Sequence, residues 1–400
     1  MSHRHQRVEN RRARWYVPMA SRDSHEEHRS ATPLELFFDL CFVVAVALAA
    51  SGLHHEVAEG HIGEGVFRYS IVFFAIWWAW MNFTWFASAY DTDDGIYRIT
   101  TFIQMAGVLV LAAGVPRIFE SSDFGLSVAG YVIMRLAMVA QWLRAAQTDP
   151  PSRSAALRYA TGIALVQLLW VARVALPDDF LWPTILLLIV VELSIPVWAE
   201  RAVRTAWHPH HIAERYGLFT IIVLGESILA ATTAIQSALD AGLDDPELIL
   251  LAISGLVLVF SMWWLYFDQA EHPREGSLRT AFTWGYGHLF VFAAAAAVGA
   301  GIAVEVDYKT EVAQIGEAEA ALSTAVPVAL YLVAVWLIHV LPNRRGVLAA
   351  AYPGAAALSI AAVFTPARIL GTSIVVAALV ALMILLREDE DGAFGDQWEP

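Results

Sequence analysis

The sequence predicts an all-α membrane protein: a polytopic bundle of about twelve transmembrane helices, arranged as two parallel six-helix repeats. Hydrophobic residues make up 58% of the chain and charged residues only 16%, and the mean hydropathy is +0.54. Apolar runs of about 20 residues, the length that crosses the hydrocarbon core of a bilayer, recur along the 400 residues. The two halves of the chain also share a pattern, in which an apolar helix passes through a Trp pair to an acidic loop. The lipid bilayer is therefore the expected surrounding of nearly the whole chain.

Each candidate span lies between charged residues or between Pro and Gly breaks. In chain order, the spans are 33–53, 66–88, 97–116, 125–146, 154–175, 180–198, 212–236, 247–267, 278–303, 318–341, 346–364 and 366–386. With an even number of spans and a cytosolic N-terminus, 19 of the 25 Arg and Lys residues lie on the inner side and 5 on the outer side. We therefore expect a multipass inner-membrane protein whose N- and C-termini are both cytoplasmic.

The repeat rests on two segments that end alike. "FAIWWAWMNFTWFASAYDTDD" (74–94) and "LVFSMWWLYFDQAEHPRE" (258–275) each pass from an apolar helix through a Trp pair to an acidic inner loop. Six spans per repeat preserve orientation, so the halves would be parallel. The predicted organisation is a basic cytosolic tail (1–31), a first repeat (32–206), a second repeat (207–386) and an acidic cytosolic tail (387–400).

Several functional classes are excluded by what the sequence lacks. Its single cysteine, Cys41, rules out an internal disulfide and a cysteine-based metal site. Its one lysine, Lys309, lies in an outer loop, so no span carries a lysine for a retinal Schiff base, and there is no Walker A motif. The net charge of −14 lies mainly in loops and in the C-terminal tail. We expect no nucleic-acid partner and no cofactor.

The spans contain ionisable residues that a lipid-facing helix would exclude. A charge at the centre of a span costs about 2.5–3.5 kcal/mol on insertion scales, so each such residue is expected to have a structural or functional role. Glu35 and Asp39, four residues apart in "LELFFDL", would lie on one face of the first helix. The other candidates for substrate or ion binding are Arg135, Glu192, Glu214, Glu226 and His288.

We expect the five acids to share one polar cavity open to the cytosol, partly neutralised by Arg135. The surplus of negative charge would bind cations or hold protons. In the alternative, the charges form a structural network that locks the helices together. Arg135 should pair with Glu226, Asp39 or Glu192, and we prefer Glu226 because it lies nearest the midplane by residue count.

A metal site is weakly indicated at one place. His211 and Glu214 are one turn apart in "HPHHIAER" (208–215), and imidazole with carboxylate suits zinc, iron or manganese. The sequence has no HExxH motif and no second cluster of this kind.

Two functions from different classes remain. The first is a secondary transporter or channel that handles protons or small cations, with or without a coupled small-molecule substrate. The second is an intramembrane enzyme that acts on a lipid or prenyl substrate, with the carboxylates as general acid or base or as metal ligands. The sequence identifies no catalytic residue, and it does not decide whether the protein assembles into a homo-oligomer.

Two long motifs resemble a known family. "TPLELFFDLCFVVAVALAA" (32–50) and "HHIAERYGLFTIIVLGESIL" (210–229), with "FAIWWAW" and "MWWLYFD", are similar to the bacterial low temperature requirement A (LtrA) family. The similarity covers about residues 32–386. It implies a bacterial multipass inner-membrane protein and implies no substrate. The family motifs fall on Glu35, Phe38, Asp39, His211, Glu214, Arg215, Gly225, Glu226 and Ser227.

Overall fold

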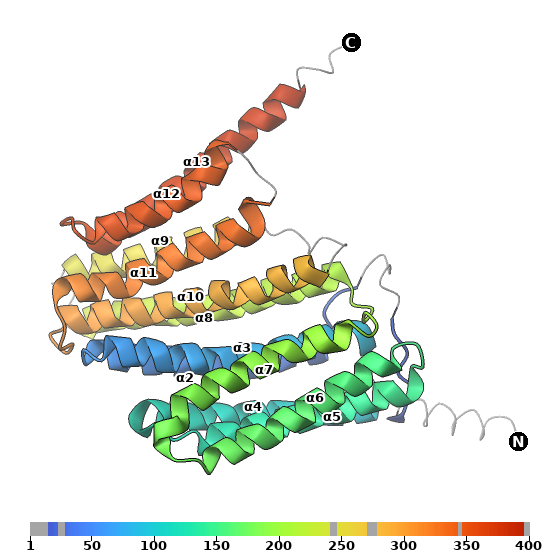
Figure 1. Ribbon diagram of the computed structural model, residues 1–400. Helices are drawn as coiled ribbons and strands as arrows, with labels where there is room; N and C mark the ends of the chain where they lie inside the picture. The colour runs from blue at the N-terminus through green and yellow to red at the C-terminus, as the bar shows by residue number, and fades with distance from the viewer. Residues whose placement is uncertain (1–14, 23–28, 241–245, 270–277, 343–345, 396–400) are drawn as a thin grey trace, which may run out of the picture. The chain divides into compact units, whose positions relative to one another are not determined.

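The computed structural model describes residues 15–22, 29–240, 246–269, 278–342 and 346–395, and these residues form helices and no strand (Figure 1). The α-helices are α2 (Pro33–Ala58), α3 (Ile62–Tyr90), α4 (Gly95–Ser121), α5 (Gly125–Thr148), α6 (Arg153–Val174), α7 (Leu181–Glu200), α8 (Pro209–Asp240), α9 (Pro246–Phe267), α10 (Leu278–Lys309), α11 (Glu317–Val335), α12 (Val347–Ala362) and α13 (Arg368–Gly395). The predicted all-α transmembrane bundle is confirmed. The predicted tails lie partly outside the described residues, at 1–14, 23–28 and 396–400.

Each of the twelve predicted spans corresponds to one of these helices. Eleven of the described helices are long and apolar enough to cross a membrane. The remaining one, α12, has 16 residues and is therefore about 24 Å long, short of the roughly 30 Å of a hydrocarbon core. Pro353 lies inside it, as the sequence shows. The count of full-length spans is thus one lower than the prediction.

The helices divide into two compact units. Unit 1 contains the described residues up to 48, residues 72–215 and Leu278. Unit 2 contains residues 49–71, 216–240 and 246–269 and the described residues from 279 onward. The helices α2 and α3 contribute residues to both units, whereas the predicted repeats assign both helices to the first half. The parallel relation between the two halves stays a prediction.

In unit 1, neighbouring helices pack in chain order. The helix α5 contacts α4 and α6, and α6 contacts α7 (Figure 1). Small residues allow α4 and α5 to approach closely: a Cβ on Gly130 would lie 2.2 Å from the backbone nitrogen of Leu111 and 2.6 Å from the carbonyl oxygen of Gly107. This contact is of the kind that joins helices in membranes, where small residues let backbones touch.

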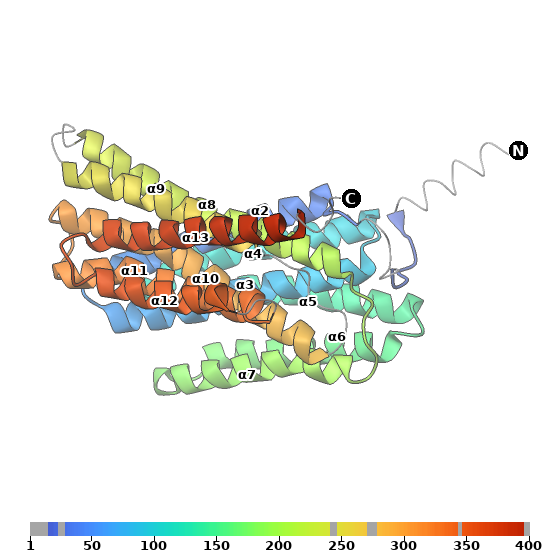
Figure 2. The same cartoon turned by 90° about the horizontal axis from the view of Figure 1, so that it is seen from above.

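In unit 2, α12 packs against α11 and α13, and α13 also packs against α9 (Figure 2). A short π-helical segment, Trp336–Val340, continues α11. Such wide turns occur mostly as single bulges in α-helices and often lie at functional sites. Here the bulge carries His339, whose side chain is buried.

We expect Gly130→Ala to lower the thermal midpoint of the detergent-purified protein, because the added methyl group forces α4 and α5 apart. Overpacking of this kind costs about 1–3 kcal/mol. Gly354→Ala, inside α12, is the matched control, since a Cβ there meets nothing within 4 Å. Equal midpoints for both variants would contradict the close packing.

Candidate functional site

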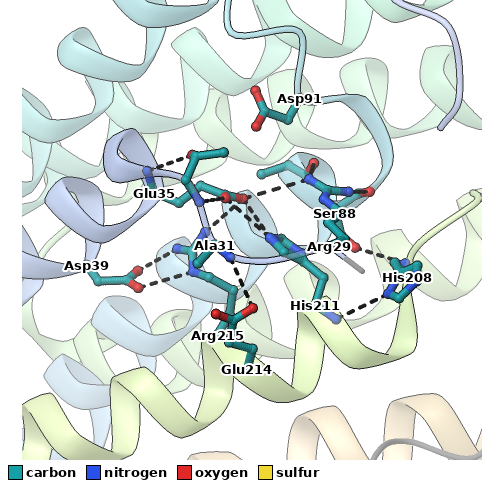
Figure 3. Close-up of polar contacts among 12 residues, drawn as sticks. Arg29, Ala31, Glu35, Asp39, Ser88, Asp91, His208, His211, Glu214 and Arg215 are labelled. Atoms are coloured by element: carbon teal, nitrogen blue, oxygen red, sulfur yellow. Dashed lines mark hydrogen bonds and ion pairs between the residues drawn. The ribbon is translucent and has the colours of Figure 1, made fainter. Parts of the chain in front are cut away.

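Two pairs of ionisable residues on different helices meet in unit 1. Glu35 and Asp39 are one turn apart near the start of α2, and His211 and Arg215 are one turn apart near the start of α8 (Figure 3). These four residues, with Arg29, are called here the Arg215 network. The side chains of Glu35, Asp39, His211 and Arg215 have no exposed surface, and Arg29 is 7% exposed. An i,i+4 pair of acids therefore faces an i,i+4 pair of bases.

Arg215 binds both carboxylates of the network. Its Nε and Nη2 donate to the two oxygens of Asp39 at 3.1 and 2.5 Å, a bidentate pairing. Its Nη1 lies 3.0 Å from Oε1 of Glu35. The same Glu35 oxygen is 3.1 Å from Nε2 of His211. The hydrogen bond between the two side chains joins Nε2 of His211 to the other oxygen of Glu35, Oε2, at 3.3 Å. Because a carboxylate only accepts hydrogen bonds, Nε2 is the nitrogen of His211 that carries the proton.

The start of α2 explains the position of Glu35. Thr32 and Glu35 form a capping box: the backbone N–H of Thr32 donates to Oε2 of Glu35 at 2.8 Å, and the N–H of Glu35 donates to the Thr32 hydroxyl at 3.3 Å. Pro33 occupies the first helical position, where a missing N–H is tolerated. A third helix, α3, supports Asp39 through Nε1 of Trp80 at 2.7 Å. The "TPLELFFDL" motif thus both begins the helix and places its acids.

Arg29, the fifth residue of the network, lies in the segment before α2. Its guanidinium donates to the carbonyl oxygens of Ser88 and Ala87 at the end of α3, and lies 4.0 Å from Glu35. Lysine and arginine are favourable at helix C-termini because the last carbonyls lack partners. Burial lowers the pKa of Arg29, while the negative charge of Glu35 acts in the opposite direction.

The charge balance corrects our expectation for this site. We predicted five acids against one arginine in a solvated cavity. Glu35 and Asp39 are instead fully buried and matched by two guanidinium groups, so the network is neutral overall when His211 is neutral. We missed Arg215 and Arg29 as partners. The i,i+4 spacing of His211 and Arg215 in "HHIAER" was the available signal.

Glu214 does not join the network. Its side chain is exposed, and its Oε2 accepts the backbone N–H of Ala31 at 3.0 Å. His211 faces Glu35, whereas Glu214 binds the Ala31 backbone, and the weakly indicated metal pair of His211 and Glu214 stays a prediction. Among the described residues, no group of three or more His, Cys, Asp and Glu side chains is arranged to hold a metal ion.

A second buried carboxylate, Glu192 of α7, joins four helices of unit 1. It lies 3.0 Å from Nη2 of Arg135, and neither side chain is more than 2% exposed. Its other donors are Trp78 at 2.8 Å, Tyr131 at 2.9 Å, Gln167 at 3.2 Å and Trp170 at 3.2 Å. Arg135 therefore pairs with one of the three expected carboxylates, but our preference for Glu226 was wrong. Five donors surround Glu192, an environment that suits a fixed anion.

The two remaining predicted site residues lie in unit 2. His288 of α10 is buried, and its Nδ1 lies 2.8 Å from the carbonyl oxygen of Trp284, so Nδ1 carries a proton. Its Nε2 lies 3.1 Å from the Tyr266 hydroxyl and 3.3 Å from Nε2 of His339. Glu226 of α8 is half-buried. The structure places His288 in a hydrogen-bonded cluster with Tyr266 and His339, and ion binding at His288 and Glu226 stays a prediction.

We expect Arg135→Ala to lower the thermal midpoint more than Arg135→Ala combined with Glu192→Gln. The single change leaves a buried carboxylate without its cation, which costs roughly 3–5 kcal/mol, and the second change removes that charge. Adding Glu226→Gln to Arg135→Ala is the control and should restore nothing. Recovery with Glu226→Gln rather than Glu192→Gln would overturn the pairing.

Comparison with known proteins agrees with the resemblance found in the motifs. The family model described as bacterial low temperature requirement A protein (LtrA) matches residues 30–386, nearly the whole chain. The chain is also similar to Uncharacterized protein RA0937 of Rhizobium meliloti (strain 1021), with 28% identity over 291 residues, which cover 67% of this chain and 68% of that protein. This chain is therefore a multipass membrane protein that belongs to the bacterial low temperature requirement A family.

Proposed function

We propose that this protein is a proton-handling secondary transporter of the bacterial inner membrane, and that the Arg215 network is where it takes up and releases protons. One observation carries the proposal. The imidazole of His211 and the two carboxylates of the network lie fully buried around the guanidinium of Arg215, near the starts of α2 and α8. A buried ion pair is often no more stabilising than apolar residues of the same volume. Ionisable residues inside spans accordingly mark proton or substrate pathways by default.

The geometry favours protons over metal cations. Arg215 occupies both oxygens of Asp39 and one oxygen of Glu35, so a cation would have to displace a guanidinium. A proton needs no such space. When Glu35 is protonated, it no longer attracts Nη1 of Arg215, and the network gains one positive charge. The contact between the starts of α2 and α8 weakens as a result, which gives the protein two states that differ in protonation.

The orientation follows from the charge distribution. We place the starts of α2 and α8 on the cytosolic side, because that orientation puts most Arg and Lys residues inside. In this arrangement the Arg215 network exchanges protons with the cytosol. The Glu192 cluster, formed by Glu192, Arg135, Trp78, Tyr131, Gln167 and Trp170, holds the helices around it in place.

The proposal is tested with purified protein in liposomes that contain a pH-sensitive dye. Under an imposed pH gradient and membrane potential, we expect proton flux with the wild type and, with Glu35→Gln, only the leak of protein-free liposomes, because the variant has no titratable group at that position. Glu214→Gln is the matched control, since Glu214 is exposed and outside the network.

His211→Gln provides a second variant in case Glu35→Gln reduces folding, which size-exclusion chromatography and thermal melting would reveal. We expect it to lose flux as well. The proposal fails if wild-type liposomes carry no more protons than protein-free liposomes under every imposed gradient.

A further inference from the structure

Three buried side chains of unit 2 bring nitrogen and oxygen atoms close together. Tyr266 belongs to α9, His288 to α10 and His339 to the π-helical segment after α11, and none of the three is more than 1% exposed. Nε2 of His288 lies 3.1 Å from the Tyr266 hydroxyl and 3.3 Å from Nε2 of His339. The ring centroids of Tyr266 and His339 are 5.3 Å apart, so each ring lies beside the other two. These three residues are called here the His288 cluster.

The spacings within the His288 cluster match those between the ligands of a tetrahedral metal ion. Zinc binds nitrogen and oxygen ligands at about 2.0–2.1 Å, so two ligands of one tetrahedral ion lie about 3.3–3.4 Å apart. The measured separations from Nε2 of His288 are 3.1 and 3.3 Å. Imidazole nitrogen is also a favoured ligand of zinc and related ions. Binding of an ion therefore requires these two separations to change by no more than a few tenths of an ångström.

Hydrogen bonding alone leaves a conflict in the cluster. Nδ1 of His288 donates its proton to the carbonyl oxygen of Trp284 at 2.8 Å, so Nε2 of the neutral ring has one lone pair and no hydrogen. Both the Tyr266 hydroxyl and Nε2 of His339 lie at hydrogen-bond distance from this nitrogen. If Nε2 of His339 carries a proton, two donors compete for one lone pair, and if it does not, two lone pairs face each other. A bound cation removes the conflict, because all three atoms then act as ligands.

The surroundings of His288 are those of a metal-binding histidine. Such a histidine usually donates its other ring N–H to a carbonyl oxygen or a carboxylate, which fixes the tautomer, and the bond from His288 to Trp284 has this form. The ring centroids of Trp284 and Tyr216 lie 4.2 and 4.9 Å from that of His288. Aromatic rings of this kind limit the access of water to a site.

The position of His339 depends on the wide turn that carries it. The backbone N–H of Leu341 donates to the carbonyl oxygen of Trp336 at 2.7 Å, one residue further back than in a regular α-helix. The extra residue in this turn changes the direction in which the following side chains leave the helix. Single π-bulges are found frequently at functional sites. The bulge is therefore a second feature, independent of the interatomic distances, that favours a function for this cluster.

We propose that Tyr266, His288 and His339 bind one zinc ion through Nε2 of each imidazole and through the tyrosine oxygen. Three protein ligands leave the fourth position of a tetrahedral ion for water or a substrate, as in catalytic zinc sites. The third ligand is a tyrosine rather than another His, Cys, Asp or Glu side chain. Tyr266 and His339 lie 22 and 51 residues from His288 along the chain, so no local motif indicates the site. The inference is independent of proton transport by the Arg215 network.

The test measures the metal bound to protein that is purified, with an affinity tag that contains no histidine, from cells grown with added Zn²⁺. The ligands are buried, so we expect the ion to bind as the protein folds. Elemental analysis should find one zinc ion per wild-type chain and only background zinc with His288→Gln or His339→Gln. Loss of a mere outer-shell partner already weakens metal binding roughly 10–100-fold, and loss of a ligand should weaken it more.

His61→Gln is the matched control. His61 belongs to the same unit, its side chain is 61% exposed, and it lies 3.6 Å from Glu56 and 3.8 Å from Glu59. It therefore represents metal held at the surface by a histidine and carboxylates. We expect this variant to keep the zinc content of the wild type.

Tyr266→Phe tests the site if the histidine variants fold poorly, which size-exclusion chromatography would show. It keeps the aromatic ring and removes one ligand, so we expect it to hold less zinc than the wild type. Growth with Co²⁺ provides a spectroscopic readout, because tetrahedral Co²⁺ absorbs visible light strongly. We expect this absorption with the wild type and its loss with His288→Gln and with His339→Gln.

The inference is overturned if the wild type, from cells grown with either metal, holds no more metal than the variants of the His288 cluster. It is also overturned if His288→Gln and His339→Gln retain zinc, or if His61→Gln loses it, since the ion then lies elsewhere. Metal content is measured without any proton gradient, so failure of this inference leaves the proposed function standing, and the reverse also holds.

Discussion

Unit 1 depends on one guanidinium placed between two carboxylates. Arg215 has no exposed surface, binds Asp39 through two nitrogens and lies 3.0 Å from Glu35 through the third. Without it, two carboxylates would share a buried site with one imidazole and Arg29. Like charges within a few ångströms cannot both stay ionised. The two buried acids at the start of α2 therefore require Arg215, at the start of α8, beside them.

The same interaction connects structure to proposed function. A neutral network is stable when buried, yet a single proton on Glu35 changes its charge and removes one attraction between two helices. The segment before α2 adds to this coupling, because Arg29 reaches both Glu35 and the last carbonyls of α3. Structural locking and proton handling are thus compatible in one site. The Glu192 carboxylate accepts hydrogen bonds from five donors on three other helices, and we assign it only the structural role of holding these helices together.

Hydropathy predicted the helices well, because each apolar run must satisfy its own backbone in lipid. The exception was α12, whose predicted span of 346–364 included residues beyond a helix of 16 residues. Depth along a helix also identified Glu192 as a candidate partner of Arg135, but depth alone does not give the direction of a side chain, so Glu226 was preferred. Arg215 was missed because its partner Asp39 lies 176 residues away along the chain. Only the folded arrangement of α2 and α8 makes it the cation of Asp39.

The central claim is that Arg215 compensates the buried charges of Glu35 and Asp39. The direct measurement is the thermal midpoint of Arg215→Gln, compared with Arg215→Gln combined with Asp39→Asn, in detergent at neutral pH. We expect the single variant to be strongly destabilised, by roughly 3–5 kcal/mol, and the double variant to recover a large part of that loss. A single variant as stable as the wild type, or a double variant less stable than the single one, would contradict the claim.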